Sequence, residues 1–326
     1  MTDRPSRDIN LTPADEPAGV VMSAAAARRL AEIACVGVMI LWAGNFVVVK
    51  TTIPILTPVG YAFLRFGLAG IVLLVVCLWR EGSVRLARAE IPRLAALGAL
   101  GFCVYQTLWS TALQSTSVGN SALLIAATPI FTVIVAVAVG TDTLTTAKLV
   151  GALIAFAGVG IVTASDGFVL GPGLAGDALT LVAAFSWAVY SSLGARVMRT
   201  RSPLRATAWT VTFGSLFLAP LGLWQLAHAD LSFVGPTHVA ALLYSALLSS
   251  AVGNAVIFWG ISLLGPTRIT NLQFLPPAIA IVLAALFLGD PILVSQIVGG
   301  VVIVAGVLIG RRTPIRQAVG AAQARP

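Results

Sequence analysis

Ten long apolar stretches, separated by short polar segments, constrain this chain more than any other feature of its sequence. They cover residues 33–50, 58–79, 94–114, 119–139, 147–164, 178–198, 204–226, 238–260, 268–288 and 292–310. A helix needs about 20 apolar residues to cross the hydrocarbon core of a bilayer. Backbone groups in that core must be hydrogen-bonded within the protein, which favours helices. The sequence therefore predicts an all-α integral membrane protein with ten transmembrane helices.

The composition excludes several other classes of protein. Of the 326 residues, 58% are hydrophobic and only 10% are charged, whereas about a quarter of a soluble domain is charged. So few charges cannot cover a water-facing surface, which excludes a soluble enzyme and a disordered chain. The formal net charge of +8 would suggest nucleic acid in a soluble protein. Here the charges follow the membrane segments, so we expect a lipid bilayer and no nucleic acid as partner.

The basic residues predict the orientation of the helices. With a cytoplasmic N-terminus, 18 of the 20 Lys and Arg residues fall in cytoplasmic segments, while Lys50 lies on the opposite side and Arg65 inside a span. Loops rich in Lys and Arg stay on the cytoplasmic side during insertion. We therefore expect both termini in the cytoplasm.

An internal repeat divides the chain into halves. Residues 127–162 align without gaps on residues 275–310, with nine identical pairs that include Pro129 with Pro277 and Gly151 with Gly299. A weaker match, offset by 145 residues, pairs Trp42 with Trp187. Each half holds five predicted helices, and an odd number makes the second half enter the membrane from the opposite side. Inverted repeats around a midplane site are typical of secondary transporters.

The repeat sets the expected domain boundaries. We predict a disordered cytoplasmic tail over residues 1–30, a first five-helix repeat over 31–164, a second over 176–310, and a cytoplasmic tail over 311–326. The glycines of residues 171–176 match a dinucleotide-binding pattern, but no strand–helix–strand unit surrounds them. With no Walker A sequence, nucleophile elbow or metal-ligand cluster, the sequence predicts no catalytic residue, no metal and no cofactor.

Arg65 is the ionisable side chain placed well inside a predicted span. Such residues are costly in a membrane and usually functional. The alternative is that the side chain extends toward the interface or caps backbone carbonyls. Lys50, near the end of the preceding span, is a candidate companion for binding an anion.

Polar and aromatic side chains recur in the middle of several spans, at the three- and four-residue spacing that places them on one face of a helix. An amide in hydrocarbon is costly unless it is paired. Each could simply hydrogen-bond between helices, but together they predict a shared cavity that binds a substrate. With Arg65, the candidate residues are Trp42, Asn45, Tyr105, Gln106, Trp109, Trp187, Tyr190, Asn254 and Asn271.

Other features favour structural roles. Small residues such as Gly151, Gly299 and Gly306 recur at four-residue spacing, which favours close helix packing and leaves open a homodimer. Pro129, Pro276 and Pro277 are expected to kink the helices that contain them.

Sequence motifs in both halves resemble those of EamA-like members of the drug/metabolite transporter superfamily. The first half supplies Trp42–Phe46, Lys50, Pro58, Arg65-Phe66, Ala112-Leu113 and Thr116-Ser117, and the second supplies Leu275–Pro277, Leu288–Asp290, Gln296, Gly299 and Gly306. Asp290 stands where glutamate is commoner, and Thr141-Asp142 replaces the usual Gly-Glu. The resemblance implies ten helices, two inverted repeats and a central cavity. In that family the cargo is a small metabolite, often an amino acid exported from bacteria.

The resulting functional hypothesis is a secondary transporter of the bacterial cytoplasmic membrane that exports amino acids or similar small metabolites by alternating access. One alternative is uptake or exchange of a small organic anion attracted by Arg65 and Lys50. Another is a membrane-embedded lipid enzyme, for which the sequence offers no nucleophile or acid–base pair. Glu32 and Asp177 lie at helix starts, so energy coupling stays open among protons, exchange and facilitated diffusion.

Overall fold

The computed structural model describes residues 23–138, 144–164, 172–198, 202–264, 269 and 272–311, and each regular element within these ranges is a helix. The helices are α1 Ala24–Leu56, α2 Pro58–Glu81, α3 Ile91–Gly98, η1 Ala99–Val104, α4 Tyr105–Ala112, α5 Val118–Ile125, α6 Thr128–Ala138, α7 Thr146–Thr163, α8 Pro172–Met198, α9 Pro203–Ala227, η3 Leu231–Phe233, α10 Pro236–Leu243, η4 Tyr244–Val252, α11 Gly253–Leu264, α13 Leu275–Leu288 and α14 Val294–Arg311.

The described helices form a bundle of membrane-spanning segments. Eight helical segments are long and apolar enough to cross a bilayer, and some of them, such as Ile91–Ala112, combine several consecutive elements. Leu275–Leu288 and Val294–Gly310 are apolar but shorter. Many large apolar side chains point outward, as Trp79, Leu286 and Phe287 do. An outer surface of this kind suits lipid and not water. The protein is therefore a multi-pass membrane protein.

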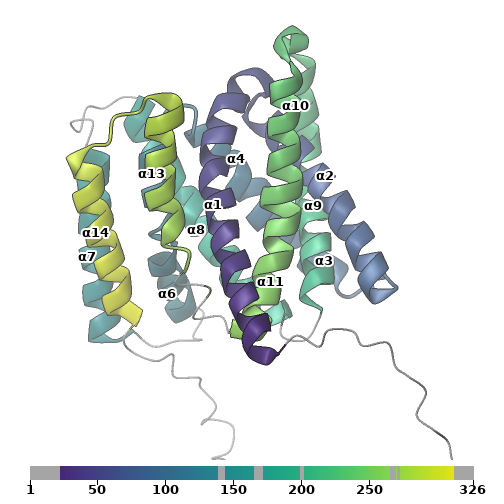
Figure 1. Cartoon of the computed structure of the whole chain (residues 1–326), viewed down its shortest axis with the longest axis horizontal. Helices are drawn as coiled ribbons and strands as arrows, with labels where there is room; N and C mark the ends of the chain where they lie inside the picture. Colours follow the sequence, from purple (N-terminus) through teal and green to yellow (C-terminus); the bar gives the residue numbers. More distant parts are fainter. Residues whose placement is uncertain are drawn as a thin grey trace, which may run out of the picture.

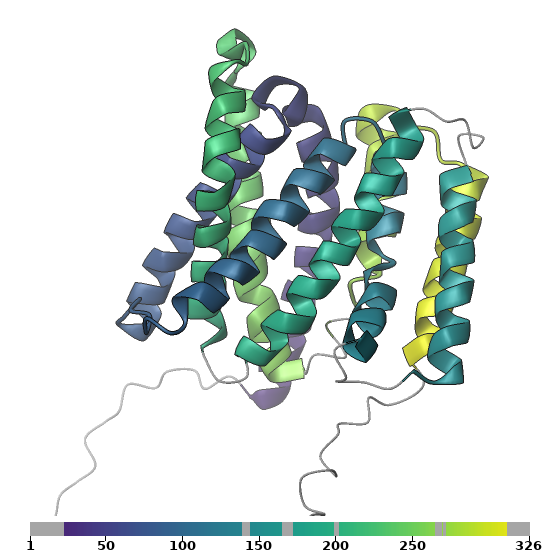
Figure 2. The same cartoon turned by 180° about the vertical axis from the view of Figure 1, so that it is seen from behind.

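Successive membrane spans run in alternating directions, so the bundle has two distinct ends (Figure 1). At the proximal end, α1 begins at Ala24 and α14 ends at Arg311. At the distal end, α1 ends at Leu56 and α14 begins at Val294. Seen from behind, α7 and α14 form a pair at one side of the bundle, away from α2 and α9 (Figure 2).

The first helix is longer than the predicted span of 33–50. It begins at Ala24, within the stretch expected to be a tail, because the alanines around Arg28 and Arg29 are good helix formers. Ser23 caps its first turn, and its side chain accepts a hydrogen bond from the backbone N–H of Ala26. At the other end the helix includes Pro54 and stops before Thr57, whose φ is 60°.

The three prolines that were expected to form kinks lie in the first turns of helices in the structure. The predicted span 119–139 is two helices, because α5 ends at Ile125 and α6 begins at Thr128, one residue before Pro129. Pro276 and Pro277 lie in the first turn of α13. Proline is tolerated there because first-turn N–H groups have no helical partner. The kinks expected inside these helices are therefore wrong for Pro276 and Pro277.

Two spans contain a π-helical segment that the sequence did not predict. They are η1, Ala99–Val104, between α3 and α4, and η4, Tyr244–Val252, between α10 and α11. Adding either repeat offset, 145 or 148, to the η1 residues places them inside η4. Segments of this kind are rare and often occur at functional sites.

Glycine pairs join α7 to α14 within the chain. A Cβ atom added at Gly151 would lie 2.6 Å from the carbonyl oxygen of Gly306, and one added at Gly158 would lie 2.8 Å from that of Gly299. In both cases the obstacle is backbone, so only glycine allows this approach. The 148-residue offset relates Gly151 to Gly299 and Gly158 to Gly306, and so converts each contact into the other. The small residues therefore pack helix on helix inside one chain.

Candidate functional site

Arg65 is buried in the bundle without a counter-ion among the described residues. Its side chain is 6% exposed, its guanidinium carbon lies 4.2 Å from the ring centroid of Phe66, and its Nε has no hydrogen-bond partner. Tyr61 and Tyr105 are the groups within electrostatic range. Because an unpaired buried cation is costly, it marks a position suited to an anionic ligand.

A short polar series connects Arg65 to the first helix. Tyr61, one turn before Arg65 on α2, donates from its hydroxyl to the carbonyl oxygen of Ala241 at 3.3 Å. The Tyr61 hydroxyl also interacts with the side chain of Ser245, which donates to Oδ1 of Asn45. Asn45 is 6% exposed. The predicted residues Asn45 and Arg65 therefore share a polar region formed by α1, α2 and η4.

The aromatic candidates form a continuous series of ring contacts. The rings of Tyr105 and Trp109 are stacked, with centroids 6.4 Å apart. Tyr105 lies 5.0 Å from Trp187, which lies 4.8 Å from Tyr190. The Trp109 ring also meets Phe46 of α1 edge to face at 5.2 Å. These contacts bring together four candidates from α4 and α8, one helix from each half of the chain.

The remaining candidates have varied surroundings. Gln106 is 5% exposed and its Oε1 has no hydrogen-bond partner. Trp42 donates from Nε1 to the carbonyl oxygen of Ser249 at 2.9 Å. Asn254 donates from its side-chain amide to the carbonyl oxygen of Ser250, one turn earlier in the chain, at 2.6 Å. Asn271 lies outside the described residues.

The ammonium group of Lys50 is hydrogen-bonded to backbone carbonyl oxygens. Its ammonium donates to the carbonyl oxygens of Leu113 at 2.6 Å, Thr116 at 2.8 Å and Gln114 at 3.4 Å. These carbonyls follow the end of α4, where helical carbonyls lack partners. All three ammonium hydrogens are thus engaged in capping α4, which corrects the expectation that Lys50 assists Arg65.

Sequence reasoning missed a second buried charge, at the distal end. Asp177 of α8 is 2% exposed. It accepts hydrogen bonds from Oγ1 of Thr116 and from Nδ2 of Asn120 at 3.3 Å. Gln296 of α14 in turn donates to Oδ1 of Asn120 at 2.9 Å. Asn120 and Gln296 are polar residues inside apolar stretches, a signal that could have directed attention here.

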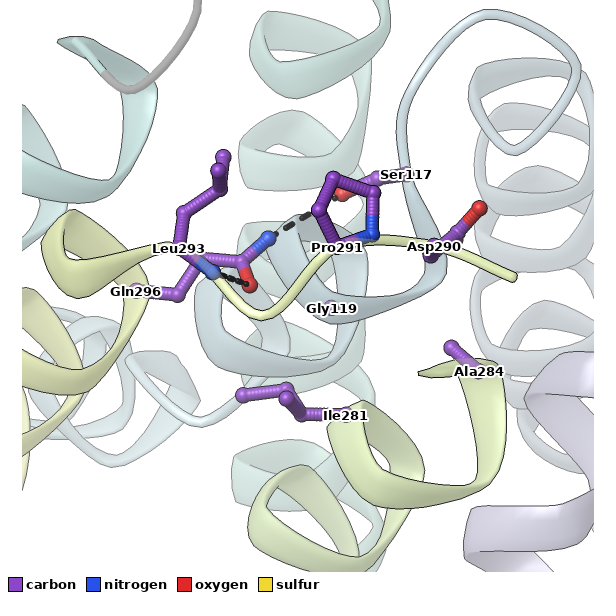
Figure 3. A pocket seen from close by; sticks show the side chains of 8 residues that line it. All are labelled: Ser117, Gly119, Ile281, Ala284, Asp290, Pro291, Leu293 and Gln296. Carbon is purple, nitrogen blue, oxygen red and sulfur yellow. Dashed lines mark hydrogen bonds between the residues drawn. The ribbon is translucent and has the colours of Figure 1, made fainter. Parts of the chain in front are cut away.

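A pocket adjoins this second network (Figure 3). Its volume is about 120 Å³, and Ser117, Asp290 and Gln296 are among the residues that line it. The Gln296 amide points toward Ser117, and Asp290 lies beyond Pro291 (Figure 3).

A bundle of apolar spans around a buried cation and aromatic rings defines an integral membrane protein with a candidate site for a small molecule. Comparison with known proteins supplies the family. The sequence profile described as "EamA-like transporter family" matches residues 29–164 and again residues 174–310. The chain belongs to this family of transporters.

Its relatives are transporters at modest identity. An uncharacterized transporter of Archaeoglobus fulgidus is 28% identical over 83% of this chain and 93% of that protein. A probable terminal-alkyne amino-acid exporter of Streptantibioticus cattleyicolor is 27% identical over 84% of this chain and 91% of its own length. A probable amino-acid metabolite efflux pump of Salmonella typhimurium is 28% identical over 83% of this chain and 91% of that protein.

A solved crystal structure shares the fold. It superposes with a TM-score of 0.61 and 20% identity, covering 86% of this chain and 96% of that chain. At this identity the likeness concerns the fold alone.

Proposed function

We propose that this protein is a secondary transporter of the bacterial cytoplasmic membrane that exports amino acids or similar small metabolites by alternating access. The substrate site lies beside Arg65, at the meeting of α1, α2, α4 and α8. Asn45, Gln106 and the aromatic series contribute to it. The observation that carries this proposal is the buried guanidinium, which has no counter-ion among the residues that the structure describes.

Arg65 matches the carboxylate of the substrate. A guanidinium presents donors in a planar fork that fits a carboxylate, and the Nε donor of Arg65 is unused. In a site this buried, bringing an anion to Arg65 also relieves the cost of the unpaired charge. A carboxylate-bearing substrate is therefore favoured over a neutral or cationic one.

The surroundings of Arg65 suit the rest of an amino acid. Gln106 offers an unused acceptor, Oε1, for an ammonium group. The rings of Tyr105, Trp109 and Trp187 offer faces that attract a cation or an apolar side chain. Two relatives bear names that mention amino-acid export or amino-acid metabolite efflux.

The repeat supports alternating access. The family profile matches each half separately, close to the proposed repeats 31–164 and 176–310. The glycine contacts of α7 with α14, and the two π-helical segments, fall at repeat-related positions. We infer ten spans in two inverted five-helix repeats, with both termini cytoplasmic. An inverted pair lets one half rock against the other around a midplane site.

Transport of a small organic anion is the second candidate, because Arg65 alone would serve it. Counterflow in proteoliposomes separates the two. Radiolabelled amino acids, the matching carboxylic acids without the amine, and the matching amines without the acid are compared on the purified protein. The proposal expects uptake of amino acids, weak uptake of the acids and none of the amines. Equal uptake of acids and amino acids would favour the anion transporter, and uptake of amines alone would contradict a carboxylate site.

A further inference from the structure

Asp177 is the one carboxylate among the described residues that is almost wholly withdrawn from solvent, with 2% of its surface exposed. It lies in the sixth position of α8 and not in a loop. The hydroxyl of Thr116 and the side-chain amide of Asn120 are among the groups that donate hydrogen bonds to it. Ionisable residues buried in membrane bundles commonly mark ion or proton pathways.

The network around Asp177 joins the two halves of the chain. Thr116 and Asn120 belong to the first half, whereas Asp177 and Gln296 belong to the second. Gln296 donates to Asn120 at 2.9 Å, so the four side chains form a link across the distal end of the bundle. Opening that end by moving the halves apart requires these hydrogen bonds to break.

Charged groups near this link come from two further elements. Lys50 of α1 donates to the carbonyl oxygen of Thr116 at 2.8 Å. Asp290, between α13 and α14, is within electrostatic range of Lys50. The polar contacts from α5 and α14 are the uncharged Asn120, Ser117 and Gln296. Hydrogen bonds accepted by an ionised carboxylate are stronger than those accepted by a neutral carboxylic acid.

The adjoining pocket brings water close to the network. Its volume of about 120 Å³ accommodates several waters, since one needs about 10–15 Å³ measured in this way. Ser117 and Gln296 belong both to the pocket lining and to the network. Gln296 lines the pocket and donates to Asn120, which donates to Asp177, so hydrogen bonds connect the pocket lining to the carboxylate.

The repeat gives the proximal end a chemically different counterpart. The 145-residue offset relates Asp177 to Glu32, and the 148-residue offset relates Gln296 to Lys148 and Asn120 to Arg268. An acid therefore occurs in the first helix of each repeat. The amides Gln296 and Asn120 of the distal network correspond to the basic residues Lys148 and Arg268.

We propose that Asp177 is a proton-binding site that holds the distal end closed when ionised and releases it when protonated. A proton from water in the pocket adds to the carboxylate as the network opens. The neutral acid then accepts the Thr116 and Asn120 hydrogen bonds more weakly. Proton binding thereby favours the open conformation, and the reverse transfer to water lets the network re-form. This inference does not depend on which substrate is carried.

Thiol labelling tests the proposal without a substrate. Cys35, Cys77 and Cys103 are replaced by alanine, and Ala284→Cys places a reporter in the pocket lining, where Ala284 is 1% exposed. The protein in nanodiscs is treated with a hydrophilic thiol reagent at neutral and acidic pH. A separate Ser232→Cys protein, exposed in the α9–α10 connection, supplies the reagent's own pH dependence. We expect the normalised labelling rate to rise severalfold at acidic pH.

Three substitutions give the proposal its specificity. Asp177→Asn should remove the pH response, and Asp177→Glu, which keeps a titratable group, should retain it. Asp290→Asn, at the same end and in the same pocket, should also retain it. A pH response that survives in Asp177→Asn, or labelling that is absent at every pH, would overturn the proposal. If Asp177→Asn does not fold, loss of the response in Asp177→Glu would likewise contradict it.

Discussion

The indole Nε1 of Trp42 donates to the backbone carbonyl oxygen of Ser249 at 2.9 Å. Ser249 lies in η4, and the first helix of the other half makes the corresponding contact, since Oγ of Ser186 in α8 donates to the carbonyl oxygen of Leu100 in η1 at 3.0 Å. In each case a side chain in the first helix of one repeat donates a hydrogen bond to a backbone carbonyl oxygen in the π-helical segment of the other repeat. These contacts lie beside the proposed site.

Replacing Trp42 by Phe should destabilise the protein. The substitution removes the indole donor, leaves the Ser249 carbonyl without that partner, and costs about 1–3 kcal/mol. We expect a lower midpoint of thermal unfolding in detergent. Trp224→Phe is the matched control, because Trp224 is 59% exposed. A Trp42→Phe protein as stable as the Trp224→Phe protein would mean that this hydrogen bond contributes little.

The packing of α7 on α14 predicts a contrast between two glycines of one helix. A Cβ at Gly151 would lie 2.6 Å from backbone atoms of Gly306 and Gly310, whereas a Cβ at Gly160 meets nothing within 4 Å. Gly151→Ala should therefore cost about 1–3 kcal/mol through forced separation of the helices. Gly160→Ala should be neutral or stabilising, because alanine favours a helix. Thermal unfolding of both variants checks the contrast, and equal midpoints would count against it.

The apolar stretches and the glycine spacing allowed much of this fold to be predicted, because hydropathy and close packing act locally along a helix. The candidates on α4 and α8 were likewise recognisable, since aromatic residues three and four apart share a face. The π-helical segments were not predictable, because a shifted hydrogen-bond pattern leaves the apolar pattern intact. The burial of Asp177 also escaped notice, since it depends on helices that are distant in sequence. Lys50 was misread because its carbonyl partners lie over 60 residues away.

The inverted arrangement predicts the sidedness of three loops. Reporter fusions after residues 170 and 232 should both be external, while a fusion at residue 200 should be cytoplasmic. The reason is that one span separates residue 170 from 200, and one further span separates 200 from 232. Paired phosphatase and fluorescent reporters would read opposite signals at each site. Finding residues 170 and 200 on the same side would refute the inverted repeat.

The central claim, that Arg65 binds the carboxylate of a transported amino acid, is tested most directly by counterflow with Arg65 variants in proteoliposomes. Arg65→Lys should retain partial uptake with a raised KM, because lysine keeps the charge but lacks the planar fork. Arg65→Met, of similar length and without charge, should abolish uptake while the protein remains folded and monodisperse. Because Arg65→Met removes an unpaired buried charge, this substitution should not lower the midpoint of thermal unfolding. Normal uptake by Arg65→Met, or its failure to fold, would contradict the account.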